Sequence, residues 1–180
     1  GVTIMLLDEG MDTGPLIAQH EFFLKGNETT DQLTTTLFEL GGKLLQESLP
    51  QWQSGELLSE PQNESLASAT RKLERADGLA DWSLSADELE RRARAFTPWP
   101  GLFTDWDGSG LKLVSVAFVA SDSAEFVPGT VVATNHPDLL AAVATSRGFL
   151  GLKTVQLEGK RALSVKDFLN GAPDFIGARL

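Results

Sequence analysis

The apolar residues at the start of the chain follow the patterns of strand, loop and strand. Val2–Leu7 is a continuous apolar run, which predicts a strand covered on both faces in an α/β sheet. Asp8–Gly14 is polar and contains two glycines, which predicts a loop. Pro15–Leu24 then predicts a second strand, with proline at its first position or at a sheet edge.

A long helix is predicted from Thr29 to about Ser54. Thr29 and Gln32 have the spacing of a capping box, in which each residue satisfies a backbone donor of the first helical turn. Apolar residues recur after it every three or four positions, as on one face of a helix. They are Leu33, Leu37, Leu40, Leu44, Leu45 and Trp52.

Beyond residue 76 the pattern changes to a short helix and then to short strands. A helix begins at about Ser85 and ends before Pro98, and another runs from Ser164 to Gly171. Five strand candidates lie between them, in fewer than 60 residues, and this density favours a five-stranded Greek-key OB barrel. The candidates are about Gly101–Trp106, Leu111–Val119, Gly129–Thr134, Leu139–Thr145 and Phe149–Leu157. Between Pro98 and Pro100, which stiffen the chain, we predict that Trp99 packs in the core.

Composition excludes several classes of protein. The 180 residues include no Cys, so disulfides and thiolate metal sites are excluded, and two His (His20 and His136) leave little for a histidine metal site. We therefore expect no metal. No apolar run reaches the roughly 18 residues of a membrane span. The net charge of −10 is uneven, because residues 1–70 carry −9 and residues 71–180 carry −1.

The acidic loop Asp8–Gly14 is the strongest candidate for chemistry. Its three carboxylates follow a predicted buried strand, and in open α/β sheets ligands bind at the carboxyl ends of strands. Crowded carboxylates can move protons, and Gly10 and Gly14 would let a ligand approach the backbone. An ordinary turn capped by Asp side chains fits the same residues. Basic residues form small groups after residue 70, which suit either a phosphate backbone or pairing with nearby Glu.

Several motifs together resemble folate-dependent formyltransferases, and specifically the methionyl-tRNA formyltransferase family. Residues 1–24 resemble the second half of that family's catalytic domain, through Gly-Val-Thr-Ile-Met and Asp-Glu-Gly-Met-Asp-Thr-Gly-Pro. The stretch from Lys72 to Gly101 is similar to the family in Asp81-Trp82-Ser83 and in Pro98-Trp99-Pro100-Gly101. Gly159-Lys160-Arg161-Ala162-Leu163 resembles its C-terminal end.

This resemblance implies the transfer of a formyl group from 10-formyltetrahydrofolate to the methionyl amino group of initiator tRNA. Asp12 matches the family's catalytic Asp, and we expect it to orient the substrate and accept a proton. Asp8, Gly10 and Met11, with Asp12, would lie near the folate. The implied tRNA-binding residues are Lys72, Arg75, Lys160 and Arg161.

The implied organisation is an α/β remnant of a Rossmann-like formyltransferase domain followed by an OB-like β-barrel domain. We assign residues 1–57 to the catalytic part, 58–76 to a linker and 77–180 to the tRNA-binding domain. The family's catalytic Asn and His lie upstream of the matched segment, so we expect this chain alone to be inactive. The full-length protein is expected to be a monomer in the cytoplasm, or in an organellar matrix of a eukaryote, without membrane attachment.

Two alternatives remain open at this point. One is another enzyme that uses 10-formyltetrahydrofolate, either a formyltransferase acting on an amino sugar or a formyl-folate hydrolase. The other is a non-catalytic OB-type module that binds tRNA. Formylation of charged initiator tRNA compared with an amino sugar separates the enzymes, and tRNA binding without transfer identifies the module.

Overall fold

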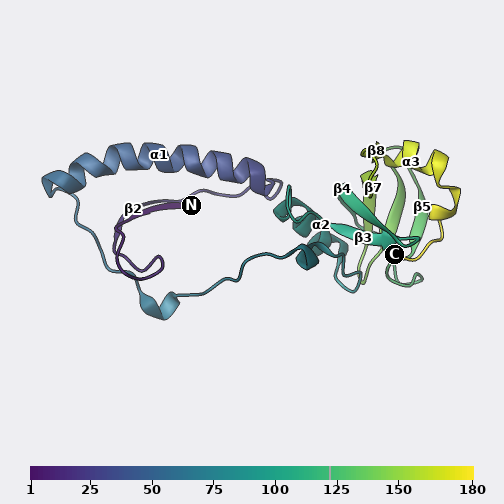
Figure 1. The fold of residues 1–180 in the computed structure, drawn as a ribbon, viewed down its shortest axis with the longest axis horizontal. Helices are drawn as coiled ribbons and strands as arrows, with labels where there is room; N and C mark the ends of the chain where they lie inside the picture. The colour runs from purple at the N-terminus through teal and green to yellow at the C-terminus, as the bar shows by residue number, and fades with distance from the viewer. Residues whose placement is uncertain (122) are drawn as a thin grey trace. The chain divides into compact units, whose positions relative to one another are not determined.

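The computed structural model describes residues 1–121 and 123–180. Contacts within the chain divide it into two compact units, Gly1–Lys72 and Leu73–Leu180 (Figure 1). No helix in the described part of the chain combines the length and apolar content needed to cross a membrane.

The first unit is a β-hairpin against which a long helix packs. Strands β1 (Val2–Met5) and β2 (Leu16–His20) pair antiparallel, with Val2 opposite His20. Helix α1 (Thr30–Ser54) contacts both strands. The strand β1 is half-buried to exposed, so the predicted covering of both faces is not found within the described residues.

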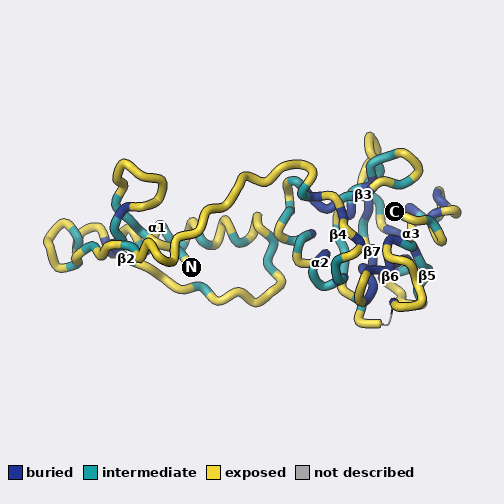
Figure 2. Tube along the Cα trace, turned by 90° about the horizontal axis from the view of Figure 1, so that it is seen from below, coloured by how far each residue is buried: buried dark blue, intermediate teal, exposed yellow. Residues whose placement is uncertain are grey.

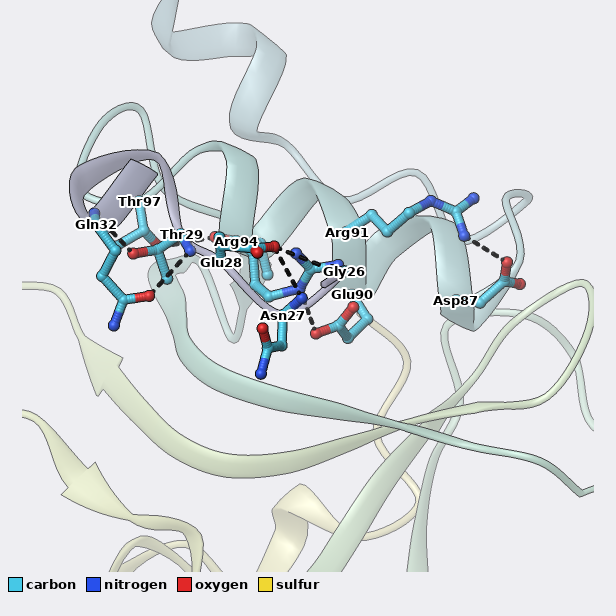
Figure 3. Close-up of polar contacts among 11 residues, drawn as sticks. Gly26, Asn27, Glu28, Thr29, Gln32, Asp87, Glu90, Arg91, Arg94 and Thr97 are labelled. Carbon is cyan, nitrogen blue, oxygen red and sulfur yellow. Dashed lines mark hydrogen bonds and ion pairs between the residues drawn. The ribbon is translucent and has the colours of Figure 1, made fainter. Parts of the chain in front are cut away.

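Helix α1 begins and ends where the sequence predicted. The Thr29 hydroxyl accepts a hydrogen bond from the Gln32 N–H (3.4 Å), and the Gln32 side chain accepts one from the Thr29 N–H (3.2 Å), so the capping box is confirmed (Figure 3). Gly55 ends the helix with a left-handed φ of 78°. The face formed by Leu33, Leu37, Leu40 and Leu44 is half-buried, as the spacing predicted.

A single antiparallel sheet organises the second unit. Its six strands lie in the order β3-β4-β7-β6-β5, with β8 pairing β7, and the helix α2 (Ala86–Ala95) packs against β4 and β7. The strands are β3 (Phe103–Trp106), β4 (Ser109–Val119), β5 (Val131–His136), β6 (Leu139–Ala144), β7 (Phe149–Leu157) and β8 (Leu163–Ser164). All five predicted strands are therefore present, within two residues of their predicted ends.

The predicted closed OB barrel is not confirmed. In the described residues the pairing runs from β3 to β5, and no pairing joins these two strands. The chain itself occupies both edges. The Ala80 N–H donates to the Phe103 carbonyl (2.8 Å) at the β3 edge, and the Val131 N–H donates to the Ala178 carbonyl (2.9 Å) at the β5 edge. Other segments of the chain thus pair with the start of each edge strand, without barrel closure.

The core of the second unit lies between the sheet and three helical segments, α2, α3 (Val165–Gly171) and η3 (Pro173–Phe175). Leu89, Leu150 and Phe175 are completely buried there. The rings of Trp106, Phe168 and Phe175 meet edge to face, with centroids 5.1 Å, 5.2 Å and 5.5 Å apart. Buried positions accordingly concentrate in these strands in Figure 2.

Candidate functional site

The acidic loop after β1 is a compact turn stabilised by its own side chains. The Asp8 carboxylate accepts hydrogen bonds from the Gly10 N–H (3.0 Å) and from the Thr13 hydroxyl (2.6 Å). The Leu6 N–H donates to the Pro15 carbonyl (2.9 Å) and closes the base of the loop. Asp8 therefore acts as a turn-capping residue, which was the alternative interpretation of this stretch.

A residue far away in sequence holds the other side of this loop. The Gln62 side-chain amide donates to the carbonyls of Asp12 (2.8 Å) and Gly14 (2.7 Å). The segment that carries Gln62 is fixed in turn, because Glu60 and Leu16 exchange backbone hydrogen bonds of 2.7 Å and 2.8 Å. Nothing in the sequence spacing pointed to Gln62, since it lies about 50 residues from the loop it contacts.

The two glycines of the loop serve its internal packing. A Cβ at Gly10 would overlap the Thr13 side chain, and a Cβ at Gly14 would overlap the Leu6 carbonyl oxygen. These neighbours fill the space that we had expected a ligand to approach. Binding of a ligand near Gly10 stays a prediction, whereas the need for glycine at both positions follows from the loop itself.

Asp12 lies at the exposed tip of the loop with its backbone constrained. Its φ of 55° is in the left-handed region, which Asp tolerates better than most residues. Its carbonyl is held by Gln62, while the residue itself and the neighbouring Met11 are exposed. Asp8, Gly10, Met11 and Asp12 thus lie together on one exposed loop. No group of His, Cys, Asp or Glu suited to a metal ion occurs among the described residues.

The four predicted tRNA-binding residues fall in three places. Lys72 is exposed at the end of the first unit. Arg75, in the short helix η2 (Arg75–Gly78) of the second unit, lies over the ring of Phe103, 5.8 Å from its centroid. Lys160 and Arg161 are exposed beyond the end of β7 and line a pocket of about 210 Å³.

A second pocket, of about 290 Å³, lies where β3, β4 and β7 meet the loop before β3, and we call it the β3–β4 pocket. Arg75 lines it, and it shares Leu157 with the pocket beside Lys160 and Arg161. Trp99 also lines it and is 56% exposed, so the prediction that Trp99 packs in the core is wrong. The remaining lining residues include Phe103, Lys112, Gln156 and Glu158.

The arginines of α2 are paired along their own helix. Arg91 pairs with Asp87 (2.8 Å), Arg92 with Glu88 (3.1 Å) and Arg94 with Glu90 (2.8 Å), each across one helical turn; Figure 3 shows the first and third pairs. Pairs of this kind near the surface add little stability, but they offset the positive charge of this helix. The pairing interpretation of these basic residues is therefore confirmed, and α2 does not present an unbalanced basic stripe.

Comparison with known families identifies the family to which the chain belongs. Residues 72–173 match the family described as "Formyl transferase, C-terminal domain", and residues 1–49 match "Formyl transferase". The chain belongs to the formyl transferase family, which confirms the resemblance seen in its motifs. Its curated relatives include the methionyl-tRNA formyltransferase of Roseiflexus sp. (strain RS-1), 41% identical over 180 residues, and that of Myxococcus xanthus (strain DK1622), 42% identical over 171 residues.

The chain spans about half the length of these relatives: 100% of the chain matches 54% of the Roseiflexus protein, and 95% matches 53% of the Myxococcus protein. Solved structures share its fold. HypX from Aquifex aeolicus in complex with tetrahydrofolic acid matches 97% of the chain and 30% of its own, with a TM-score of 0.68 and 17% identity. An N-formyltransferase from Helicobacter canadensis, solved with folinic acid and dTDP-3-aminofucose, matches 88% of the chain and 55% of its own, with a TM-score of 0.60.

Proposed function

We propose that the protein to which this chain belongs transfers a formyl group from 10-formyltetrahydrofolate to the amino group of methionyl initiator tRNA, in the cytoplasm. The observation that supports this most is the match of the whole chain to relatives named methionyl-tRNA formyltransferase, at 41% identity. The constrained acidic loop adds a physical reason, since it presents one carboxylate at a fixed backbone position.

Asp12 is the proposed catalytic residue. The folate substrate supplies the formyl group, and the amino nitrogen forms the new bond to the formyl carbon as the bond to the folate nitrogen breaks. The amine must lose a proton in this exchange, and the folate nitrogen must gain one. An exposed carboxylate at the tip of a loop whose backbone is hydrogen-bonded to Gln62 can accept the first proton and orient the amine.

The acceptor RNA is proposed to bind through Lys72, Arg75, Lys160 and Arg161. These side chains are all exposed, and in the second unit they lie beside two pockets rather than in one stripe. Each contact of this kind with a phosphate releases counterions, so each adds to the salt dependence of binding. Removing the charge at Arg75 should weaken RNA binding and lower the salt slope by about one unit.

The test is a formylation assay on the protein as its gene encodes it, with 10-formyltetrahydrofolate and either methionyl initiator tRNA or a nucleotide amino sugar as acceptor. The proposal expects transfer to the tRNA. Asp12→Asn should lower kcat by about 100-fold or more, because general acid–base catalysis contributes roughly 10²–10⁴-fold. Asp138→Asn, at an exposed position in the turn between β5 and β6, is the matched control and should keep its activity.

The other outcomes each reject part of the proposal. Transfer to the amino sugar alone would assign a different acceptor. Binding of tRNA without transfer to either acceptor would favour the non-catalytic module. An unchanged kcat in Asp12→Asn would remove Asp12 from catalysis. The expected inactivity of the 180-residue chain alone stays a prediction, checked by the same assay on this polypeptide.

A further inference from the structure

The β3–β4 pocket has a floor built from three strands. Phe103 of β3 lies opposite Lys112 of β4, and Lys112 lies opposite Gln156 of β7. Cross-strand partners point to the same face of a sheet, so these three side chains form one row across the floor. The Gln156 side-chain amide donates to the Lys160 carbonyl (2.8 Å), which fixes this end of the row.

An aromatic ring and a guanidinium complete the walls. Trp99 is 56% exposed although a Trp side chain carries a large apolar surface that is usually buried. Its neighbours Pro98 and Pro100 have fixed φ angles, so little backbone entropy remains to be lost when a ligand contacts the ring. Arg75 lies over Phe103 and faces the same pocket.

The size and charge of the pocket restrict its ligand. Its volume of about 290 Å³ is at the lower end of the roughly 300–1,000 Å³ typical of ligand pockets, so it suits one small planar group. Arg75 and Lys112 bring two positive charges and Glu158 brings one negative charge, which leaves a net attraction for an anion. Glu158 repels phosphate from its side of the pocket and so favours one orientation of a ligand.

We propose that the β3–β4 pocket binds one unpaired nucleotide of an RNA partner, with the base stacked on Trp99 and its phosphates facing Arg75 and Lys112. This inference rests on the proposed function, because it names a contact for the RNA acceptor. An exposed aromatic ring beside cations on a sheet face is the arrangement with which proteins hold single-stranded bases. A paired base would present no free face to the ring.

The test measures Trp fluorescence while the full chain is titrated with a single-stranded RNA tetranucleotide, rA4. A fully paired, blunt-ended RNA duplex is titrated in parallel at equal phosphate concentration. We expect rA4 to quench the fluorescence and the duplex to leave it unchanged. Because the Trp99 variants lack the ring that reports binding, the Kd of every variant is measured by the fluorescence anisotropy of fluorescein-labelled rA4. Trp99→Ala should raise this Kd by about 5- to 150-fold, the range for loss of one base stack, and Trp99→Phe should recover most of the affinity.

Two further variants separate stacking from charge and from folding. Lys112→Ala should lower the salt slope of rA4 binding by about one unit. Phe118→Ala removes another half-exposed aromatic side chain of the same unit, outside the pocket, and should leave the Kd unchanged. Thermal melting of each variant confirms that it is folded.

The inference is overturned if Trp99→Ala binds rA4 as tightly as the unchanged chain, or if the blunt-ended duplex quenches as strongly as rA4. It is also overturned if rA4 gives no quenching. The ligand of this pocket would then be a protein or a small molecule. The formylation assay keeps these results apart from the proposed function. If Trp99→Ala transfers the formyl group to tRNA with an unaltered KM for tRNA, only the proposed nucleotide pocket is rejected. If rA4 binds but no formyl group is transferred, only the proposed reaction is rejected.

Discussion

The two units of the chain differ in how far their apolar side chains are buried. In the second unit Leu89, Leu150 and Phe175 are fully buried in one core. In residues 1–72, all of which the structure describes, Ile17 is the one apolar side chain that is buried. Phe23 and Phe38 of that unit are 82% and 79% exposed. Figure 2 shows the same contrast along the trace.

This contrast also separates the two candidate sites. The acidic loop of the first unit keeps its shape through hydrogen bonds of Asp8 and Gln62, with little apolar packing beneath it. The β3–β4 pocket lies on a sheet whose other face is packed against the core. The residues that line the pocket are therefore held in place by a packed core. The shape of the loop instead depends on a few polar contacts that water can compete for.

The largest expected effect comes from separating the units. A polypeptide of residues 73–180 should unfold cooperatively, because its core is complete within those residues. Residues 1–72 alone should show no cooperative transition. Circular dichroism during heating checks both polypeptides, and a sharp transition in the 1–72 fragment would mean that its hairpin and helix suffice for a stable fold.

Truncation of one phenylalanine in each unit tests the contrast at the level of single side chains. Phe175→Ala should reduce the free energy of unfolding by about 3–5 kcal/mol, since it empties a filled site in the core. Phe38→Ala, at an exposed position of α1, should change it by less than about 0.5 kcal/mol. Urea denaturation of the full chain gives both values, and similar losses in the two variants would refute the contrast.

The loop is expected to respond to loss of a single amide side chain. Gln62→Ala removes two hydrogen bonds to loop carbonyls, each contributing about 1 kcal/mol, so the loop should open more often. The Gly10 amide should then exchange with solvent up to about 30-fold faster by NMR, since about 2 kcal/mol is lost. Gln46→Ala, on the exposed surface of α1, is the matched control. Equal exchange in both variants would show that Gln62 does not support the loop.

The smallest effect concerns a partly exposed carboxylate of the second unit, that of Asp87. The Ser85 hydroxyl, Arg91 and Arg147 hold the pKa of Asp87 below its usual range. The stabilisation is therefore fully present above the unfolded pKa of about 3.9 and is lost as the pH falls toward the lower folded pKa. Asp87→Asn should thus lower Tm slightly at pH 7 and by less at pH 2. Asp138→Asn is the control, and a pH-independent loss in Asp87→Asn would show that charge is not the cause.

Local elements were predictable because short stretches of sequence specify them. The capping residues Thr29 and Gln32 marked the start of α1, and Gly55 provides its left-handed end. Alternation and turn residues marked the five strands of the second unit to within two residues. The family could also be predicted, because its motifs are short and contiguous, such as Asp81-Trp82-Ser83.

Contacts across long stretches of sequence were not predictable. Gln62 reaches a loop about 50 residues away, and no local pattern indicates that pairing. Trp99 is a large aromatic residue between two prolines, which favours packing in the core, yet it is exposed at the rim of a pocket. The row of Phe103, Lys112 and Gln156 depends on strand register, which sequence spacing alone does not give.

By itself the sequence determined the helices, the strands, the acidic loop and the family, because each depends on backbone preferences or motifs within a few residues. Only the tertiary structure decided that the sheet stays open, since its two edges pair with Ala80 and Ala178 instead of with each other. It also decided that Asp8 caps a turn while Asp12 stays at the tip. The edge pairing and the position of Asp12 depend on partners far away in the sequence, since Gln62 holds the Asp12 carbonyl, whereas Asp8 bonds to Gly10 and Thr13 close by.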